Sequence, residues 1–300
     1  MHLFKKPFDF GRLYHIITYM ITEIKDIKAV ELDIYARLNE AQLLHYFEPE
    51  PGIFIAESPG VIIQAIEAGY EPLSLLAEKE RIDKETPQIM ECVIRHCGKE
   101  KAEGLPLYTS EREVLKELTG YALVRGLWGA FRRKPLQDIE GFCEDKKRIA
   151  VLFDIVNPTN VGAIIRSAAA LGIDGIIATS DTVNPLYRRS ARVSMGTVFR
   201  IPWTVAGKED SHGPDLILKL RNMGYLTAAM ALTENAVSIK NEGLKTADSL
   251  AVILGTEGYG LPEDVIASCD MAVKIPMHHG VDSLNVAAAS AVCFWEISEG

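Results

Sequence analysis

The sequence lacks the features that mark secreted, membrane and disulfide-stabilised proteins. Its five cysteines are odd in number and scattered over 300 residues, which argues against a disulfide framework. No charge-free apolar stretch reaches the ~18–20 residues that span a bilayer. The run His15–Ile21 is short and is followed at once by Glu23 and Lys25, with no small-residue cleavage site. We therefore expect a cytoplasmic protein with no membrane partner.

Signatures of metal and nucleotide sites are also missing. Cys92 and Cys97 flank His96, but their spacing is not the CxxC of a zinc knuckle and no second ligand pair is present. We expect structural thiols there and no metal. The phosphate-binding pattern GxxxxGK[ST] does not occur, and the glycines of Leu254–Leu261 are spaced GxxGxG rather than GxGxxG. These absences argue against a dinucleotide-dependent oxidoreductase.

Charge is distributed unevenly along the chain. The formal net charge is −9, from 32 basic and 41 acidic residues. Residues 121–200 nevertheless carry 12 Lys and Arg against 7 Asp and Glu, so the remainder carries −14. The basic residues gather at 132–134, at 146–148, and at Arg188, Arg189 and Arg192. Such clusters bind phosphates, although solvated surface charge without a partner explains any single cluster equally well.

The apolar pattern divides the chain into two domains joined by a linker. Residues 1–19 do not join smoothly to the pattern that begins at Met20, and they are predicted to be an extension that contributes little. Residues 20–131 alternate short apolar runs with amphipathic segments, which predicts a small three-layer α/β module. Its last helix, 110–119, is expected to begin at Ser110 as N-cap. Residues 132–148 are charged and punctuated by Gly and Pro, so we interpret them as a linker.

Residues 149–300 alternate regularly between strand-like and helix-like segments. The expected strands are 149–155, 175–178, 225–231, 250–254 and 272–275, and the expected helices are 160–171, 215–222, 262–268 and 283–297. Strands this apolar are buried on both faces, which predicts a mostly parallel sheet with helices on either side. In such sheets ligands bind where the strands end and loops lead into helices.

Three of these loops contain residues that folding alone does not require. In Asn157–Gly172, Asn160 is expected to cap a helix and Gly162 to permit a close backbone approach. Arg166 then lies in a very apolar helix, either as a functional residue or as an arginine that extends to solvent. In Leu254–Leu261, three glycines surround a carboxylate directly after a buried strand. Such a loop suits either ligand binding by the backbone or a tight turn.

The third loop precedes the last helix. In Ile275–Val292, Ser283 is expected to cap that helix and Asn285 to lie in its first turn. Small residues at 287–290 allow close packing, so a core helix is the simpler interpretation of this segment alone. His278 and His279 are interpreted as loop residues.

Taken together, in this order and spacing, the three loops resemble the signature motifs of the SpoU (TrmH-like) RNA ribose methyltransferases of the SPOUT superfamily. The matching residues are Asn160, Gly162, Arg166 and Gly172, then Gly255, Glu257, Gly258, Gly260 and Leu261, then Ile275, Pro276, Met277, Ser283, Leu284, Asn285 and Val286. The resemblance covers residue 149 to the C-terminus and includes Pro185–Trp203. Residues 20–131 are similar only in outline to a ribosomal-protein-like RNA-binding module of some relatives.

The resemblance implies a deep trefoil knot, which is an exception to the rule that chains are unknotted. It also implies S-adenosylmethionine bound in a bent form within the knot, and a homodimer whose catalytic pocket is built at the subunit interface. The implied cofactor-binding residues are Leu254, Gly255, Gly258, Ile275, Met277 and Leu284.

The implied reaction is methyl transfer to a ribose 2′-hydroxyl of structured RNA, with ribosomal RNA favoured over transfer RNA by analogy. Arg166 matches the family's catalytic arginine. Because a guanidinium keeps its proton at a pKa above ~12, we assign Arg166 to stabilising charge on the 2′-oxygen rather than to removing a proton.

The remaining catalytic residues implied by the resemblance would orient Arg166 and the ribose by hydrogen bonds. They are Asn160, Glu257, Ser283 and Asn285. Arg188, Arg189 and Arg192 are the predicted RNA contacts, and the reaction requires no metal. The alternative is a non-catalytic RNA-binding factor that retains the knotted fold.

Overall fold

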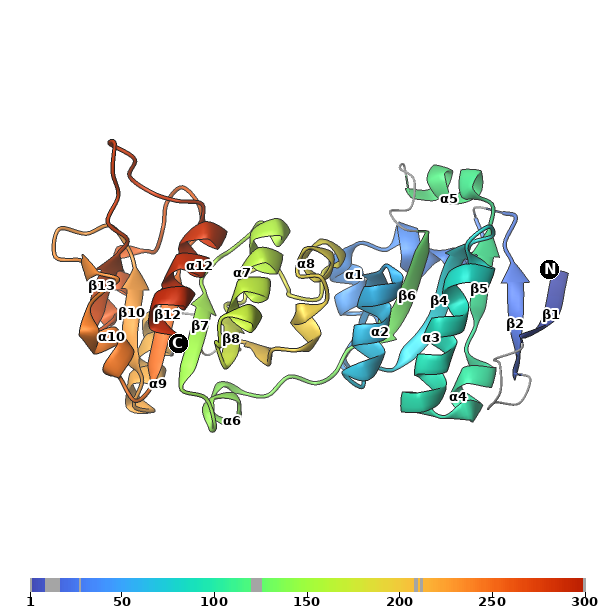
Figure 1. The fold of residues 1–300 in the computed structure, drawn as a ribbon, viewed down its shortest axis with the longest axis horizontal. Coiled ribbons are helices and arrows are strands. Elements are labelled where there is room, and N and C mark those ends of the chain that lie inside the picture. The colour runs from blue at the N-terminus through green and yellow to red at the C-terminus, as the bar shows by residue number, and fades with distance from the viewer. Residues whose placement is uncertain are drawn as a thin grey trace. The chain divides into compact units, whose positions relative to one another are not determined.

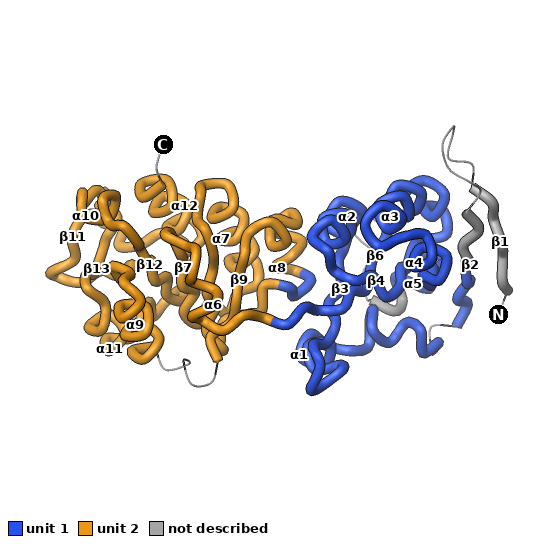
Figure 2. The backbone as a smooth tube through the Cα atoms, turned by 90° about the horizontal axis from the view of Figure 1, so that it is seen from below, with its two compact units in different colours: residues 1–135, 186–188 blue, residues 136–185, 189–300 orange. Residues whose placement is uncertain are grey.

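The computed structural model describes residues 2–8, 17–26, 28–119, 126–207, 210 and 213–298. The chain divides into two compact units (Figure 2). Unit 1 comprises residues 1–135 and 186–188, and unit 2 comprises residues 136–185 and 189–300. Each unit is built around its own β-sheet. None of the helices within the described ranges is long and apolar enough to cross a membrane.

Unit 1 forms a six-stranded mixed sheet in the order β1-β2-β5-β4-β6-β3. Its strands are β1 (His2–Phe8), β2 (Ile17–Glu23), β3 (Ile53–Glu57), β4 (Pro72–Glu78), β5 (Leu107–Ser110) and β6 (Leu127–Arg132). Its helices are η1 (Val30–Leu32), η2 (Asp33–Arg37), α1 (Glu40–Leu44), α2 (Pro59–Glu67), α3 (Ile82–Cys97), α4 (Lys99–Gly104) and α5 (Arg112–Thr119).

Successive residues along β3, β4 and β6 of unit 1 are buried, so both faces of this sheet are covered. Ile53 and Ile55 of β3 pack in one core with Tyr35 of η2 and Leu43 of α1. The intervening Phe54 stacks on Phe131 of β6, with ring centroids 5.4 Å apart. Because successive side chains of a strand point to opposite faces, unit 1 has helices on both sides of its sheet.

Two boundaries predicted from the sequence were wrong. Residues 2–8 form β1, which pairs with β2, and β2 in turn pairs with β5, so the expected extension over residues 1–19 contributes strands to the sheet. The expected linker over residues 132–148 is also structured: Arg132 ends β6, and α6 (Ile139–Cys143) buries Ile139 and Phe142 in the core of unit 2. A five-residue helix is too short to show a clear apolar period.

Unit 2 forms a seven-stranded sheet, in the order β11-β13-β10-β12-β7-β8-β9, and every neighbouring pair is parallel (Figure 1). Its strands are β7 (Arg148–Leu152), β8 (Gly175–Ala178), β9 (Trp203–Val205), β10 (Leu226–Met230), β11 (Val237–Ser238), β12 (Leu250–Leu254) and β13 (Met271–Lys274). Besides α6, its helices are α7 (Pro158–Ala170), α8 (Arg188–Val193, with Arg188 in unit 1), η3 (Thr197–Phe199), α9 (Gly213–Asn222), α10 (Glu242–Thr246), α11 (Glu263–Ser268) and α12 (Val286–Ile297).

The predicted parallel sheet with helices on both faces is confirmed. Figure 2 shows α7 and α12 on one side of the sheet and α9 and α11 on the other. Every residue of β12 is buried, as its uninterrupted apolar sequence predicts. The α9 side packs Leu216 and Leu220 against Val151 and Ile253 of the sheet. On the other side α7 and α12 pack against one another, and there they lie next to the loops that follow β7 and β13.

The helix N-caps differ from those predicted. Asn157, not Asn160, caps α7, because its Oδ1 accepts the Thr159 amide at 2.9 Å. Asn285, not Ser283, caps α12, with its Oδ1 accepting the Ala287 amide at 2.9 Å. Ser110 belongs to β5, and its hydroxyl donates to the Ile24 carbonyl at 2.7 Å, so the predicted cap of α5 is also wrong.

Candidate functional site

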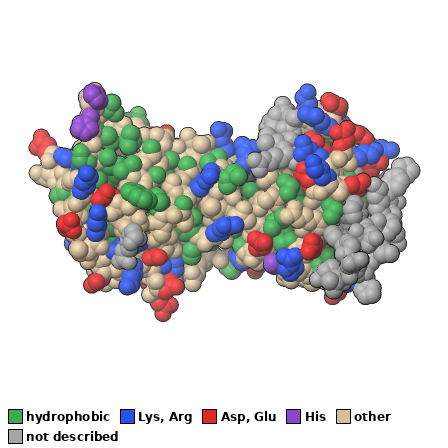
Figure 3. Space-filling model, viewed as in Figure 1, with side chains coloured by type: hydrophobic (Ala, Val, Ile, Leu, Met, Phe, Trp, Pro, Cys, Tyr) green, Lys and Arg blue, Asp and Glu red, His purple; other side chains and the backbone are tan. Residues whose placement is uncertain are grey.

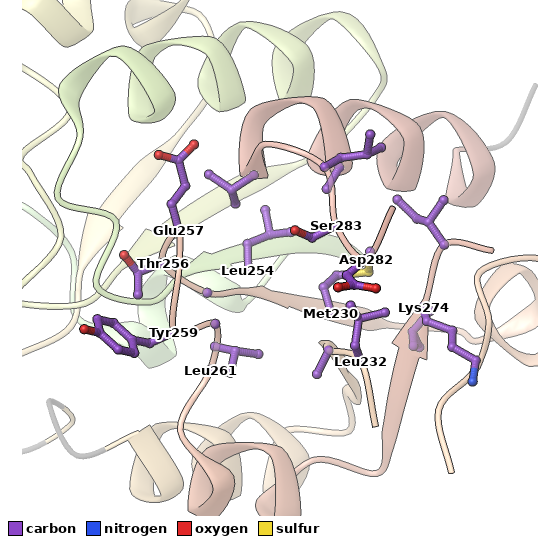
Figure 4. A pocket seen from close by; sticks show the side chains of 18 of the residues that line it. Met230, Leu232, Leu254, Thr256, Glu257, Tyr259, Leu261, Lys274, Asp282 and Ser283 are labelled. Atoms are coloured by element: carbon purple, nitrogen blue, oxygen red, sulfur yellow. The ribbon is translucent and has the colours of Figure 1, made fainter. Parts of the chain in front are cut away.

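A cavity of about 560 Å³ opens where β10, β12 and β13 end (Figure 4). Its walls come from the segment after β10, the glycine-rich loop after β12, and the loop between β13 and α12. They are Met230, Ala231, Leu232, Thr233, Leu254, Gly255, Thr256, Glu257, Gly258, Tyr259, Gly260, Leu261, Ile266, Val273, Lys274, Ile275, Met277, Asp282, Ser283, Leu284, Val286 and Ala289. The cavity thus lies at the carboxyl ends of parallel strands, where the sequence predicts a ligand site.

The glycines of the loop after β12 are required by its shape. A Cβ on Gly255 would lie 2.6 Å from the backbone carbon of Gly260, closer than real Cβ atoms approach. Gly258 and Gly260 adopt φ values of +95° and +71°, which glycine reaches without strain. A backbone bridge between Thr256 and Gly260 closes the loop. The loop therefore turns sharply at the cavity and leaves main-chain groups uncovered by side chains.

Three of the predicted catalytic side chains form a continuous hydrogen-bonded chain. The Nδ2 of Asn285 donates to the Oδ1 of Asn160 at 3.2 Å and to the Oε1 of Glu257. Because the Oδ1 of Asn285 is engaged in capping α12, the orientation of its amide is fixed and its NH₂ group must face Asn160 and Glu257. Asn160 is 5% exposed and lies inside α7 rather than at its end. These hydrogen bonds join the motifs of α7, of the loop after β12, and of α12, although Asn160 and Asn285 are 125 positions apart in the sequence.

The predicted cofactor-binding residues all line the cavity. These are Leu254, Gly255, Gly258, Ile275, Met277 and Leu284. Ser283 and Glu257 line it as well, so the cavity and the hydrogen-bonded chain share Glu257. Sequence reasoning missed Tyr259, Lys274 and Asp282, which also line the cavity. Asp282 and Tyr259 are each next to a motif residue, but neither their type nor their spacing signals a role.

Arg166 does not join the other predicted catalytic residues within one chain. It lies on α7, is exposed, and does not line the cavity. Within the described ranges, its guanidinium has no hydrogen-bond or ion-pair partner. Gly162, on the same helix, approaches the backbone of α8 as predicted: a Cβ there would lie 2.5 Å from the Ser190 carbonyl oxygen.

The three predicted RNA-binding arginines have different surroundings. Arg188 lies in unit 1, donates to the carbonyls of Tyr35 and Ile34, at 2.5 and 3.2 Å, and stacks over Trp128. Arg189 is exposed, and its Nε donates to the Thr159 hydroxyl at 2.9 Å, near the N-terminus of α7. Figure 3 shows Lys and Arg side chains scattered among hydrophobic patches on the visible face of unit 2. Arg188 is therefore tied into unit 1, whereas Arg189 presents its charge at the surface.

The carboxyl ends of β7 and β8 carry a separate polar cluster. The hydroxyl of Thr179 donates to the Asp154 carboxylate at 3.1 Å and lies 3.1 Å from the hydroxyl of Thr182. The hydroxyl of Thr182 donates to the Leu152 carbonyl at 2.8 Å. Partial burial raises the pKa of Asp154, and its bond from Thr179 opposes that rise. These groups are satisfied by one another and form no part of the cavity.

A second cavity, of about 780 Å³, lies where β7 and β12 begin. Arg148 lines it, but its guanidinium donates to the carbonyls of Lys147, Lys245 and Asp248. Lys245 is paired with Glu296 at 2.6 Å. Because most of its cationic groups are held by the chain itself, this cavity is the weaker candidate for a ligand site.

The cysteines are free thiols. Cys92 and Cys97 both lie on α3, and burial raises the pKa of each thiol, as expected for structural cysteines. Within the described ranges, no group of three or more His, Cys, Asp or Glu side chains is placed to hold a metal ion.

Comparison with known proteins matches the part of the chain that contains the three motifs and the cavity to one protein family. The model of the SpoU rRNA Methylase family matches residues 147–295. An uncharacterized tRNA/rRNA methyltransferase of Mycobacterium bovis is 28% identical over 277 residues, which cover 92% of this chain and 91% of the relative.

Solved structures with the same fold cover both units. The AdoMet-bound rRNA methyltransferase of Sinorhizobium meliloti superposes with a TM-score of 0.74 at 23% identity, over 92% of this chain and 97% of that one. A structure described as an RNA 2′-O ribose methyltransferase superposes with a TM-score of 0.68 at 22% identity, over 92% and 98% of the two chains. Through residues 147–295, which contain all three motifs and the residues that line the cavity, the chain belongs to the SpoU/TrmH-like family.

Proposed function

We propose that this protein transfers a methyl group from S-adenosylmethionine to the 2′-hydroxyl of a ribose in structured RNA. The observation that carries the proposal is the hydrogen-bonded series Asn160–Asn285–Glu257, which joins the three motifs at the edge of a cavity lined by the second and third of them. The relative described as an RNA 2′-O ribose methyltransferase shares the fold over both units and supports the choice of a ribose oxygen.

The cavity suits S-adenosylmethionine in size and chemistry. Its volume of about 560 Å³ is in the range of small-molecule sites. The uncovered backbone of Gly255 and Gly258 offers hydrogen-bonding groups for an adenine, and Leu254 and Met277 offer apolar contact. When bound, the cofactor supplies an electrophilic methyl group on its sulfonium. The protein must then mainly hold a ribose hydroxyl in line with that methyl group.

Glu257 and Asn285 hold the ribose in this proposal. Asn285 binds one carboxylate oxygen of Glu257, which leaves the other oxygen to accept a hydrogen bond from a ribose hydroxyl. Ser283 lines the same cavity and adds a second hydroxyl partner. Since Asn285 is itself fixed by capping α12, these groups are oriented before the substrate arrives.

Arg166 reaches the ribose from a second copy of the chain. Its side chain is exposed on α7, which packs against α12. The outer surface of α12 is apolar, with Val292 40% and Trp295 71% exposed. Exposed apolar side chains of this size mark association surfaces. A homodimer formed through α7 and α12 covers them and places Arg166 of one protomer toward its partner's cavity.

The guanidinium of Arg166 acts electrostatically. Because guanidinium groups in proteins stay charged, Arg166 stabilises negative charge developing on the 2′-oxygen and binds the adjacent phosphate, while RNA or solvent takes the hydroxyl proton. Arg166→Ala should therefore reduce methyl transfer at least ~100-fold, with cofactor affinity little changed. Near-normal turnover by Arg166→Ala removes this residue from the mechanism.

Subunit complementation tests whether Arg166 acts across the dimer. Arg166→Ala keeps the cavity intact, and Gly255→Ala disrupts the cavity while keeping Arg166. At a concentration of S-adenosylmethionine that saturates the wild-type cavity but not the Gly255→Ala cavity, each variant alone should have little activity. After mixing and subunit exchange, a heterodimer carries one site with an intact cavity and an arginine from the other subunit, so activity should return. A mixture that stays inactive, despite heterodimers detected by mass spectrometry, places Arg166 in its own subunit's site.

Unit 1 and α8 guide the RNA in this proposal, and a cytoplasmic location follows from such a substrate. Arg189 supplies a cation beside the N-terminus of α7, where phosphates are favoured, and Arg192 supplies a second cation from the same helix as Arg189. Arg188 positions its own segment instead, because its guanidinium is held by the carbonyls of unit 1.

The trefoil knot is also part of the proposal. β13 pairs with β10 on the side away from β12, and the chain then returns so that α12 packs against α7. This return brings the last motif beside the first and leaves the loops after β12 and β13 facing one another across the cavity.

Label transfer from methyl-labelled S-adenosylmethionine to total RNA tests the proposed function. RNA from a strain that lacks the gene should accept label, and 2′-O-methyl mapping should find one site that is missing in that strain and present in its parent. This map also decides between ribosomal and transfer RNA. Stabilisation by S-adenosylhomocysteine without transfer to any RNA supports the alternative, a non-catalytic RNA-binding factor.

A further inference from the structure

One carboxylate in the cavity has no partner within the described part of the chain. Among the residues that line the cavity, the charged side chains are Glu257, Lys274 and Asp282. Glu257 is bound by Asn285. Asp282 makes no hydrogen bond or ion pair to any residue that the structure describes, and it is exposed. The hydrogen-bonded chain of the proposed mechanism therefore does not use Asp282.

The position of Asp282 directs its charge into the cavity. Figure 4 shows its carboxylate among the side chains that line the cavity, whereas the side chain of Lys274 extends away from them. Several walls around it are apolar, including Leu232 and Leu254. Because Asp282 is exposed and has no ion pair with a residue that the structure describes, its carboxylate can accept a hydrogen bond from a cationic group that enters with the ligand.

We propose that Asp282 binds the α-ammonium group of the methionine part of S-adenosylmethionine and so selects for the amino-acid end of the cofactor. The inference rests on the proposed function, because it takes this cavity to be the cofactor site. The cofactor carries two cationic groups, the sulfonium and the ammonium. Of these two cations, only the ammonium has N–H groups that can donate hydrogen bonds. An ionised carboxylate is purely an acceptor, so it pairs best with the ammonium.

Three ligands separate the parts of the cofactor in isothermal titration calorimetry. S-adenosylmethionine has both cations, S-adenosylhomocysteine keeps the ammonium without the sulfonium charge, and 5′-methylthioadenosine lacks the whole amino-acid part. Asp282→Asn should weaken the affinity for the first two ligands by a similar factor, about 10- to 100-fold. The affinity for 5′-methylthioadenosine should stay unchanged. Asp282→Ala, which removes the acceptor as well, should weaken them at least as much.

The control is Asp181→Asn, which removes an exposed carboxylate that does not line the cavity. It should bind all three ligands as the wild type does. Equal weakening of all three ligands by Asp282→Asn overturns the proposal, because it shows a general effect on the cavity. Weakening confined to S-adenosylmethionine also overturns it, since that pattern assigns Asp282 to the sulfonium.

The outcomes distinguish this inference from the proposed function. A wild-type protein that binds none of the three ligands overturns the proposed function, and this inference with it. A wild-type protein that binds S-adenosylmethionine while Asp282→Asn binds it equally well overturns the inference alone. Thermal melting of each variant checks that it is folded.

Discussion

The two halves of the carboxyl edge of the unit 2 sheet differ in how their polar groups are satisfied. Where β7 and β8 end, Thr179 and Thr182 are 2% and 7% exposed and bond to one another, and Thr179 also bonds to Asp154. Where β12 and β13 end, a cavity exposes Asp282, and the side chain of Tyr259 is 98% exposed. One edge is closed by its own hydrogen bonds, and the other is open.

This difference shows where folding alone explains the residues. Burying an unpaired polar group costs about 1–3 kcal/mol, so a stable edge closes its own network, as the Thr179 cluster does. Polar and aromatic groups left open at the ends of β12 and β13 are better explained by a ligand and a substrate. The same comparison predicts that substitutions at the two edges have different consequences.

The largest effect in this series is expected for Asn285→Asp. An aspartate still caps α12, but it replaces the NH₂ group that donates to Asn160 and Glu257 with a second acceptor. Turnover should fall about 100-fold, as for loss of one preorganised donor, with little change in melting temperature. The matched control is Asn241→Asp, which caps α10 in the same way away from the cavity. Equal activity of the two variants contradicts a role for the hydrogen-bonded chain.

Gly255→Ala is expected to act on cofactor affinity. The added Cβ would lie 2.6 Å from the Gly260 backbone, so the loop after β12 must shift. Overpacking of this kind costs about 1–3 kcal/mol, which corresponds to about a 10- to 100-fold weaker affinity for S-adenosylmethionine by calorimetry. Gly104→Ala is the control, because a Cβ there meets no atom within 4 Å. Unchanged affinity in Gly255→Ala places the cofactor elsewhere.

The apolar runs predicted the central strands of the unit 2 sheet, β7, β8 and β12, because these strands are almost fully buried. The run 250–254 became β12, buried along its whole length. Short elements were missed because they contain too few residues to show an apolar period. Helix α6 has five residues and β9 has three. β6 (Leu127–Arg132) was missed because Gly129 interrupts its apolar run and its end was assigned to the linker.

The site was less accessible to reasoning from individual residues. Local patterns favoured Asn160 and Ser283 as helix caps, whereas Asn157 and Asn285 fill those positions. The contact between Asn160 and Asn285 joins residues 125 apart, and no local spacing signals it. Only the resemblance of the three motifs grouped these residues. Even that grouping did not place Arg166, whose position in our proposal depends on a second chain.

A moderate effect on RNA binding is expected at α8. Arg189→Ala with Arg192→Ala removes two cations from the proposed phosphate-binding surface. The slope of log affinity against log salt should become shallower by about 2, because each lost phosphate contact releases one fewer counterion. Lys240→Ala, an exposed cation between β11 and α10, should leave the slope unchanged. Parallel slopes for all three proteins assign the RNA surface to another part of the chain.

Thr179→Val is expected to have the smallest effect on the reaction. It removes the hydroxyl that bonds the backbone amide and carboxylate of Asp154 and contacts Thr182. Losing it leaves buried groups unpaired, so the free energy of unfolding in urea should fall by about 1–3 kcal/mol. The affinity for S-adenosylmethionine should stay that of the wild type, because this cluster does not line the cavity.

The surface variant Thr246→Val calibrates that loss. Its hydroxyl bonds only the Glu242 carbonyl within an exposed helix, so the free energy of unfolding should change by less than about 0.5 kcal/mol. If Thr179→Val lowered cofactor affinity as much as Gly255→Ala does, the two edges would be one coupled site. Stability loss with intact affinity keeps them separate, because the β7–β8 edge then serves the fold and the β12–β13 edge serves the ligand.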